Sequence, residues 1–395
     1  MTVIQTDPAR PAVVDLLGAY RPDAGSFFFS SPRQAMLATG AAALVPDRPA
    51  DLPAYVAELL AGARGDLAEP VAVGALPFSG FAGARLVVPA AVHRSDPIPA
   101  DGLPRPAVRA VRPTRVLPAP AASRYLDAVR QAVTMLRAGE LDKVVLARCL
   151  QVDVDQPVDV PSLLHALAWR DPHGYTYAAD LPGGRTLLGA SPELLVSRLD
   201  GQVVANPLAG SLPRAADPAE DRRRAVALRA SVKDRREHAF VVDAVVEALR
   251  PYLHQVRVPA GPPTVVPTAS MWHLSTRVTG QVIDPDVSAL QLAAALHPTP
   301  AVCGTPVDAA RTAIARLEPF DRDFYAGMVG WVDDAGDGEW VVGIRCAQVT
   351  GQSLRLYAGA GIVADSTPEA ELAETAAKFR TMLTAMGVPA GETDD

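Results

Sequence analysis

The run TLLGASPELLVSRLDGQVVANPLAG, at 186–210, constrains the fold more than any other part of the chain. Its apolar and β-branched residues come in short stretches separated by turn residues, which predicts strands. The Asp200-Gly201 pair between two of these stretches is a strong signal of a two-residue β-hairpin. We therefore expect strand, tight turn, strand, hairpin and strand in this order.

Periodicity and turn residues place the other elements. The predicted strands are 71–80, which ends in a turn, 143–154, and a hairpin over 338–363, and the predicted helices are 123–139, 234–253 and 368–386. Ser123 is the expected N-cap of the first helix and Gly139 its stop; Ser366 or Thr367 caps the last helix ahead of Pro368. The Asp/Gly-rich DDAGDG at 333–338 is expected to be a hairpin loop.

These elements predict an α/β layered fold with large, mainly antiparallel sheets, because strands do not alternate strictly with helices. The 395 residues are ample for a large core. The proline-rich stretch 97–120 cannot be regular helix and is predicted to be an extended connector over the surface. We expect one domain over 1–395, in which an N-terminal part, 1–110, packs on a core at 120–388.

Composition argues against several kinds of protein. The formal net charge of −7 argues against a nucleic-acid surface, and no run of about 20 apolar residues predicts a membrane span. The first residues do not have the pattern of a signal peptide. Cys149, Cys303 and Cys346 are odd in number and show no CxxC pair, which predicts buried thiols in a reducing cytoplasm rather than disulfides or a zinc site.

Two charged residues stand where the apolar pattern predicts burial, and a buried charge needs a partner or a task. Lys143 heads the strand KVVLAR; it is either a rim residue that reaches water or a desolvated general base. Glu193 lies in the turn of GASPELL; it is either a solvent-facing carboxylate or an acid kept protonated by apolar walls. Spacing alone leaves both alternatives open.

Two helices each carry a pair of carboxylates three residues apart, so that each pair shares one helix face. The pairs are Asp234 with Glu237 and Glu371 with Glu374. They can be ordinary surface charges, with Lys233–Glu237 and Glu374–Lys378 as ion pairs along each helix. If both pairs face one cavity, their repulsion calls for a hard cation, and oxygen ligands without a thiolate or imidazole cluster point to Mg²⁺.

An arginine and two glycines near the C-terminus suit an anion. Arg345, alone inside the predicted strand VVGIRCAQV, is of the type that grips a carboxylate of the protein or of a substrate. Gly359 and Gly361 in YAGAGIV would let backbone N–H groups approach an anion, although the motif is not a dinucleotide fingerprint. His273 in MWHLSTRV is either substrate-facing or structural, and His297 is expected to be structural.

Together these segments resemble the chorismate-utilising enzymes, which include isochorismate, salicylate, anthranilate and aminodeoxychorismate synthases. The resemblance runs from about Tyr125 to Met386 and rests on GELDKVVLAR, GASPELL, NPLAGSLPR, KDRREHAFVVD, MWHLSTRVTG, LHPTPAVCGTP, DFYAGMVGW, GIRCA and YAGAGIVADSTPEAELAETAAKF, in this order. It implies a single α/β domain of two stacked antiparallel sheets flanked by helices. It also implies a cytoplasmic, monomeric enzyme whose small-molecule substrate is chorismate.

The resemblance further implies a role for each matched residue. Lys143 corresponds to the base that activates the incoming water, and Glu193 to the acid that protonates the departing C4 hydroxyl. The implied magnesium ligands are Glu237 and Glu374, with Asp234 and Glu371 as nearby or water-mediated partners. The implied contacts to the substrate carboxylate and enolpyruvyl group are Arg345, Gly359 and Gly361, and the rest of the pocket is Gly210, Ser211, His273, Tyr325 and Lys378.

Three features favour water as the nucleophile and isochorismate as the product. The ammonia-using, anthranilate-type members typically lack a lysine at the position of Lys143. Salicylate synthases tend to carry Thr at the position of Ala301, a further pocket residue. The segments SFFFSSPRQAMLATG and VGALPF look like the isochorismate synthases of catechol siderophore (2,3-dihydroxybenzoate) pathways. A salicylate synthase, a menaquinone-pathway isochorismate synthase and a non-catalytic binding or regulatory subunit stay open as alternatives.

Overall fold

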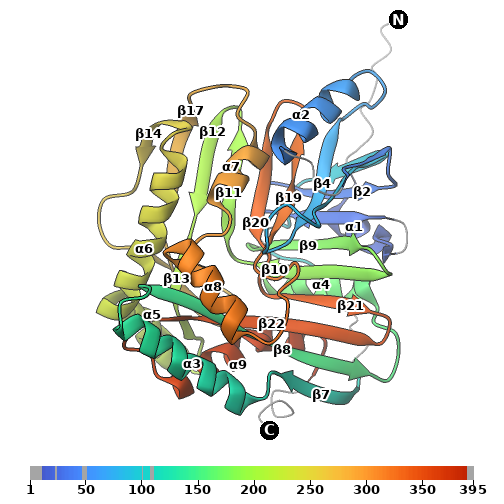
Figure 1. Ribbon diagram of the computed structural model, residues 1–395. Coiled ribbons are helices and arrows are strands. Elements are labelled where there is room, and N and C mark those ends of the chain that lie inside the picture. The colour runs from blue at the N-terminus through green and yellow to red at the C-terminus, as the bar shows by residue number, and fades with distance from the viewer. Residues whose placement is uncertain (1–10, 23–24, 47–50, 100, 107–110, 389–395) are drawn as a thin grey trace, which may run out of the picture.

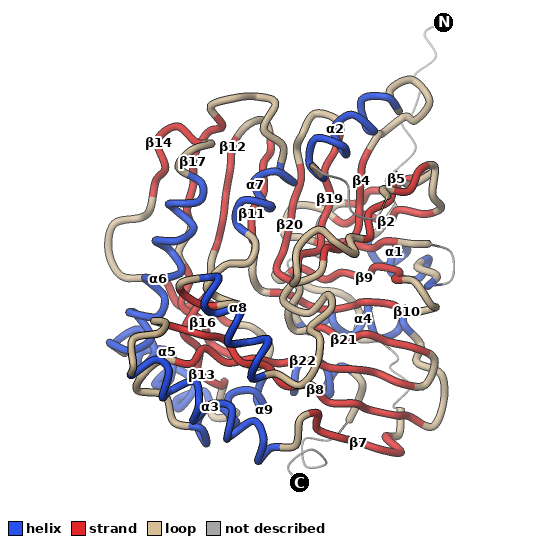
Figure 2. Tube along the Cα trace, in the orientation of Figure 1, coloured by secondary structure: helices blue, strands red, loops and turns tan. Residues whose placement is uncertain are grey.

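The computed structural model describes residues 11–22, 25–46, 51–99, 101–106 and 111–388. Within these residues the chain forms two large sheets and a small one, with helices at the edges and on the outer faces (Figure 1, Figure 2). Neighbouring strands of each sheet pair in antiparallel fashion. The predicted fold class is therefore confirmed.

The first large sheet contains the longest strands of the described chain. In spatial order its strands are β18 (Gly304–Thr305), β8 (Lys143–Val154), β22 (Ser353–Ile362), β21 (Cys346–Thr350), β10 (Arg185–Ser191), β9 (Tyr175–Leu181), β1 (Phe27–Ser30), β2 (Ala35–Thr39) and β6 (Ala91–Ser95), and β7 (Pro113–Ala119) also pairs with β8. The predicted strand 143–154 is confirmed. Because β7 belongs to the proline-rich stretch 97–120, part of that stretch is an edge strand and not a surface connector; an edge position tolerates its prolines.

The second large sheet contains the predicted hairpin. Its strands, in spatial order, are β14 (Leu253–Arg257), β17 (Val278–Val282), β12 (Gln202–Asn206), β11 (Leu194–Leu199), β20 (Gly338–Val342), β19 (Met328–Asp333), β4 (Val71–Leu76), β5 (Arg85–Val88) and β3 (Ala43–Leu44). Asp200 and Gly201, with φ of +50° and +74°, join β11 to β12 as predicted. The 333–338 loop joins β19 to β20, also as predicted. The small sheet consists of β13 (Leu208–Pro213), β16 (Met271–Ser275) and β15 (Thr264–Pro267).

One predicted hairpin is wrong. The segment 338–363 does not stay in one sheet: β20 belongs to the second sheet, and only β21 and β22 form a hairpin, in the first. Residues 343–345 carry the chain between the sheets. Arg345 therefore lies in this crossing, with a φ of +51°, and not inside a strand.

The described helices cover the sheets. They are α1 (Val13–Ala19), α2 (Leu52–Gly62), α3 (Ala122–Arg137), α4 (Val160–Arg170), α5 (Pro218–Ala230), α6 (Val232–Leu249), α7 (Ala289–Leu296), α8 (Val307–Leu317) and α9 (Pro368–Ala385). Gly139, with a φ of +75°, ends α3 as predicted, but its N-cap is Ala121, so Ser123 lies inside the first turn and the predicted cap is wrong. Thr367 is the N-cap of α9, and α6 ends at Leu249, four residues before the predicted end.

Successive side chains of a strand point to opposite faces of the sheet. In the first sheet both faces are buried, each in its own core. Phe27 and Phe29 of β1 enter a core shared with the second sheet, which includes Trp340 of β20. Phe28 enters a separate core beneath α1, α4 and α9, with Leu164 of α4. Strands from before residue 100 thus extend both sheets, and α9 is packed firmly against the outer face of the first.

Candidate active site

A pocket forms where the chain passes twice between the two large sheets. Glu193 lies where β10 of the first sheet connects to β11 of the second, and Arg345 lies where β20 connects back to β21. The two crossings bond each other: the Val342 amide donates to the Glu193 carbonyl, and the Ala190 amide donates to the Arg345 carbonyl, each over 3.1 Å. These bonds fix both residues in one place.

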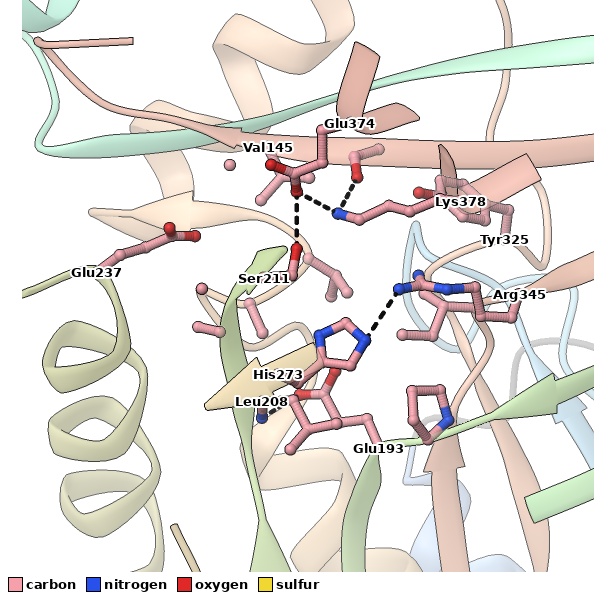
Figure 3. A pocket seen from close by; sticks show the side chains of 18 residues that line it. Val145, Glu193, Leu208, Ser211, Glu237, His273, Tyr325, Arg345, Glu374 and Lys378 are labelled. Atoms are coloured by element: carbon pink, nitrogen blue, oxygen red, sulfur yellow. Dashed lines mark hydrogen bonds and ion pairs between the residues drawn. The ribbon is translucent and has the colours of Figure 1, made fainter. Parts of the chain in front are cut away.

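Most of the predicted site residues meet in this pocket (Figure 3). Those that line it are Glu193, Gly210, Ser211, Glu237, His273, Ala301, Tyr325, Arg345, Gly359, Gly361, Glu374 and Lys378. Lys143, Asp234 and Glu371 are not among the lining residues.

Sequence reasoning missed six lining residues. They are Val145, Pro192, Leu208, Ala209, Val302 and Ile344. Each is within two positions of a predicted site residue, so proximity to the motifs was the available signal. Their apolar side chains resemble ordinary core residues in sequence, which is why they were not singled out.

Glu193 is a buried acid. Only 3% of the residue is exposed, and burial raises its pKa to about 7. A long hydrogen bond of 3.4 Å from the Leu208 amide to Oε1 lowers that pKa only in part, as do the charges of Lys143 and Arg345. A carboxyl group in this state can donate a proton near neutral pH, which fits the predicted acid and excludes the solvent-facing alternative.

Arg345 and His273 contact each other at the side of the pocket. Nη2 of Arg345 lies 3.3 Å from Nε2 of His273, and because a guanidinium only donates, Nε2 accepts (Figure 3). Burial, and then the charges of Arg345 and Lys378, hold the pKa of His273 well below its usual value. His273 is therefore a neutral imidazole beside a cation whose Nε has no hydrogen-bond partner in the described structure.

Glu374 and Lys378 lie at the end of the pocket away from Glu193 (Figure 3). Lys378 Nζ lies 2.7 Å from Oε1 of Glu374 and donates to the Gly359 carbonyl over 2.7 Å, and Ser211 Oγ donates to the same Oε1 over 3.0 Å. Burial alone would raise the pKa of Glu374, but Lys378 and Ser211 outweigh it and lower that pKa. Glu374 is therefore a carboxylate.

The two glycines of β22 admit side chains close to the strand. A Cβ on Gly361 would collide with Oε1 of Glu237, and a Cβ on Gly359 would lie 2.7 Å from Oη of Tyr325. The Tyr325 ring stacks on Tyr357, with centroids 5.0 Å apart. The glycines thus make room for pocket side chains, a use that sequence reasoning did not foresee.

Lys143 lies beneath the pocket rather than on its surface. None of its side chain is exposed, and Nζ lies 2.9 Å from Oε1 of Glu237. Nζ has no hydrogen bond of ordinary geometry, so the contact is electrostatic. The alternative of a rim lysine that reaches water is excluded.

The sequence has three lysines among its 37 Lys and Arg residues, and each of the three pairs with a carboxylate of this region. The pairs are Lys143–Glu237 at 2.9 Å, Lys233–Glu371 at 3.5 Å and Lys378–Glu374 at 2.7 Å. Of the two ion pairs along a helix that the sequence left open as an alternative, Glu374–Lys378 is present. The structure shows Lys233 paired with Glu371 across the gap between α6 and α9, while the buried Lys143 pairs with Glu237.

The four predicted carboxylates lie on α6 and α9, which the Lys233–Glu371 pair connects. Burial, and then Glu237, raises the pKa of Asp234; burial, and then Glu374, raises the pKa of Glu371. Oε1 of Glu371 is buried without a hydrogen bond. In the described part of the chain no group of three or more His, Cys, Asp or Glu side chains converges to hold a metal ion, and Glu237 and Glu374 are the two that reach the pocket.

Other predicted residues lie outside the pocket. Nε2 of His297 is 3.3 Å from the Phe78 carbonyl, and burial lowers the pKa of His297 to about 4. Cys149, Cys303 and Cys346 are buried free thiols. Among the described helices, none combines the length and apolar character that crossing a membrane requires.

The chain is similar to known proteins over most of its length. Residues 105–387 match the family model described as chorismate binding enzyme. Isochorismate synthase DhbC of Bacillus subtilis (strain 168) is 51% identical over 385 residues, 94% of this chain and 96% of that protein. The vibriobactin-specific isochorismate synthase of Vibrio cholerae is 42% identical over 365 residues, 92% of this chain and 91% of that protein.

A solved structure shares the whole fold. The putative 2,3-dihydroxybenzoate-specific isochorismate synthase DhbC from Bacillus anthracis superposes with a TM-score of 0.89 at 47% identity, covering 95% of this chain and 99% of that one. The predicted resemblance to isochorismate synthases of 2,3-dihydroxybenzoate pathways is confirmed. With the family model matching well over half of its length, the chain belongs to the chorismate-binding enzyme family.

Proposed function

We propose that this protein is an isochorismate synthase that supplies a 2,3-dihydroxybenzoate siderophore pathway. The observation that carries the proposal is Glu193, a buried carboxyl with a pKa of about 7 in a pocket that also holds Arg345 and Glu237. The relatives named isochorismate synthase, at 51% and 42% identity over nearly the whole chain, support the same reaction.

The reaction exchanges one hydroxyl for another. Water adds to C2 of chorismate and loses a proton to a base, the ring double bonds shift, and the C4 hydroxyl leaves as water after it is protonated. We assign the proton at C4 to Glu193, because its pKa of about 7 leaves it protonated often enough at neutral pH. We assign the base to Lys143, which adjoins the pocket through Glu237.

The substrate is a dianion in an acidic protein, so its charge must be met locally. Arg345 and Lys378 are cations in the pocket wall, and the neutral His273 can share a hydrogen bond without adding charge. Lys378 reaches into the pocket beside Glu374 and Arg345 reaches in beside His273, so two separate cations can meet the two carboxylates of chorismate (Figure 3).

Magnesium fits the donor set of this pocket. Glu237 and Glu374 offer carboxylate oxygens, and Asp234 and Glu371 lie one turn earlier on the same helices. Oε1 of Glu371 is buried without a hydrogen bond and contacts Lys233 only as an ion pair, at 3.5 Å. Mg²⁺ commonly takes one or two carboxylates and keeps several waters. When bound, it would neutralise a carboxylate of the substrate and fix its position.

Product analysis tests the proposal. Purified protein is incubated with chorismate, with and without Mg²⁺, and products are identified by liquid chromatography with mass detection. Magnesium-dependent isochorismate without pyruvate is the expected result. Salicylate with pyruvate would show a salicylate synthase and overturn the argument from Ala301, and no turnover would favour a non-catalytic subunit.

Pathway, assembly and location need separate tests. Deletion of the gene should abolish 2,3-dihydroxybenzoate production and spare menaquinone if the siderophore assignment is right. We also propose a cytoplasmic monomer, on the family resemblance. Light scattering after size-exclusion chromatography and cell fractionation test these two points.

A further inference from the structure

β8 lacks a partner strand along a short part of its outer edge. β18 pairs with its first two residues, and β7 pairs with it from Cys149 onward. The Val145 amide donates to the Cys303 carbonyl over 2.7 Å just beyond β18. The Val145 carbonyl and the Ala147 amide on this edge then have no strand to pair with. Val145 is 4% exposed and Ala147 2%, and backbone groups buried in this way need hydrogen-bond partners.

Two side chains from the end of α8 and the turn after it fill this gap. Nη2 of Arg322 donates to the Val145 carbonyl over 2.7 Å, and the Ala147 amide donates to Oε1 of Glu318 over 2.7 Å. Glu318 and Arg322 bond each other twice, over 2.8 and 2.6 Å, with side chains 3% and 2% exposed. The buried ion pair therefore takes the place of a neighbouring strand.

The same guanidinium also holds a second wall of the pocket. Nη1 of Arg322 donates to the Val302 carbonyl over 2.7 Å. Val302 belongs to a turn that its own amide closes onto the Thr299 carbonyl over 3.1 Å, and Ala301 lies within that turn. Val145, Ala301 and Val302 all line the pocket, whereas Glu318 and Arg322 do not.

We propose that Glu318 and Arg322 are positioning residues of the active site. They hold Val145 on one side and the Ala301–Val302 turn on the other at a fixed separation, and this sets how tightly the substrate ring is held. A buried ion pair is weak evidence for stability in itself, since apolar residues of similar volume often replace one without loss. Here the bonds go to the backbone of the pocket walls, which indicates a role in binding; this inference rests on the proposed function.

The first test is Arg322→Lys. A lysine keeps the charge beside Glu318, but a single ammonium cannot reach the Val145 and Val302 carbonyls with the geometry of the guanidinium fork. Because the walls contact the substrate and not the reacting protons, KM for chorismate should rise about 10-fold, and kcat should change much less. Arg311→Lys is the matched control: Arg311 lies over the Phe78 ring at 5.3 Å, as Arg322 does at 4.4 Å, but the Val145 and Val302 carbonyls accept from Arg322.

The second test removes both charges. Glu318→Met combined with Arg322→Met leaves no lone buried charge, so this variant should fold even if a single variant does not. It still loses the bonds to Val145, Ala147 and Val302, and its KM should also rise. Circular dichroism and thermal melts check folding, and rates are expressed per folded molecule.

The outcomes separate this inference from the proposed function. A wild-type protein without isochorismate synthase activity would refute the function. An active wild type with wild-type KM in folded Arg322→Lys and in the double variant would refute the positioning role alone. A lower melting temperature with unchanged KM would make the pair merely structural.

Discussion

Lys143 and Glu237 meet between β8 and α6, with Nζ and Oε1 2.9 Å apart and the lysine side chain fully buried. A fully buried lysine side chain needs a partner, and Glu237 on the helix supplies one. Glu237 lines the pocket and Lys143 does not, so this contact joins the first residue of β8 to the pocket.

Replacement of Lys143 tests its role as the base. Lys143→Ala should lower turnover roughly 10²-fold or more, because it removes the side chain to which we assign the proton of the attacking water. Lys143→Arg is the matched control, since a guanidinium keeps the positive charge next to Glu237 but does not release its proton. Steady-state rates on folded variants decide: near-normal turnover in Lys143→Arg would show that only the charge matters.

The activity should fall as pH rises through the pKa of Glu193. This acid works when protonated, and its pKa of about 7 means that the protonated fraction declines above neutrality. kcat/KM should therefore decrease on the alkaline side, and Glu193→Gln should cost roughly 10²-fold. Glu339→Gln is a control, because Glu339 is equally buried and burial raises its pKa, yet it bonds Ser31 away from the pocket. A loss of only a few-fold in Glu193→Gln would refute the acid.

The same carboxyl should make folding stability depend on pH. Because the folded-state pKa of Glu193 is raised from 4.5 to about 7, the folded state holds a proton that the unfolded state has released in this window. Stability from this group is therefore present at low pH and is lost as pH rises from about 4.5 to about 7. Urea unfolding at pH 5 and pH 8 should show a larger decrease for the wild type than for Glu193→Gln. The opposite sign would mean that the anion is the favoured form in the fold.

The sequence predicted elements that are governed by local chemistry. The Asp200-Gly201 pair predicted a hairpin because a two-residue turn needs positive φ angles, which both residues have in the structure. The β-branched run at 143–154 predicted the strand that is observed there. Side-chain pattern alone did not reveal which sheet a strand joins. Arg345 was placed in a strand because apolar residues flank it on both sides, and only the pairing of β20 with β11 and of β21 with β10 shows the crossing.

The site was predicted from its charged residues and from the family resemblance, and six of its apolar wall residues were not predicted. Ion pairs between helices could not be predicted either: Lys233 is four residues from Glu237, but its partner is Glu371 on α9. Glu318 and Arg322 also have the spacing of an ordinary surface pair on a helix, and only the structure shows that both are buried and that Arg322 bonds Val145 while Glu318 bonds Ala147. Long-range packing decides such cases.

Divalent cations should be required for turnover. Removal of metal with EDTA should abolish isochorismate formation, and Mg²⁺ should restore it. Calorimetry without substrate should show Mg²⁺ binding to the wild type and binding at least about 10-fold weaker in Glu237→Gln or Glu374→Gln, since each loses a charged oxygen ligand. Glu369→Gln is the control, because Glu369 is exposed on the first turn of α9 and pairs with Arg130 at 3.7 Å. Full activity after exhaustive chelation would exclude the metal.

Arg345 should govern substrate affinity more than the rate of the chemical step. Its guanidinium contacts the neutral His273 and has an unpaired Nε, so donors are free to bind a carboxylate in a bidentate manner. Arg345→Lys keeps the charge but loses the planar fork, and KM for chorismate should rise about 10-fold or more with a smaller change in kcat. Arg277→Lys, at an exposed position just after β16, should leave both constants unchanged. Equal losses of kcat and kcat/KM in Arg345→Lys would instead mean that Arg345 acts only in the transition state, on the charge that develops as the C4 hydroxyl leaves.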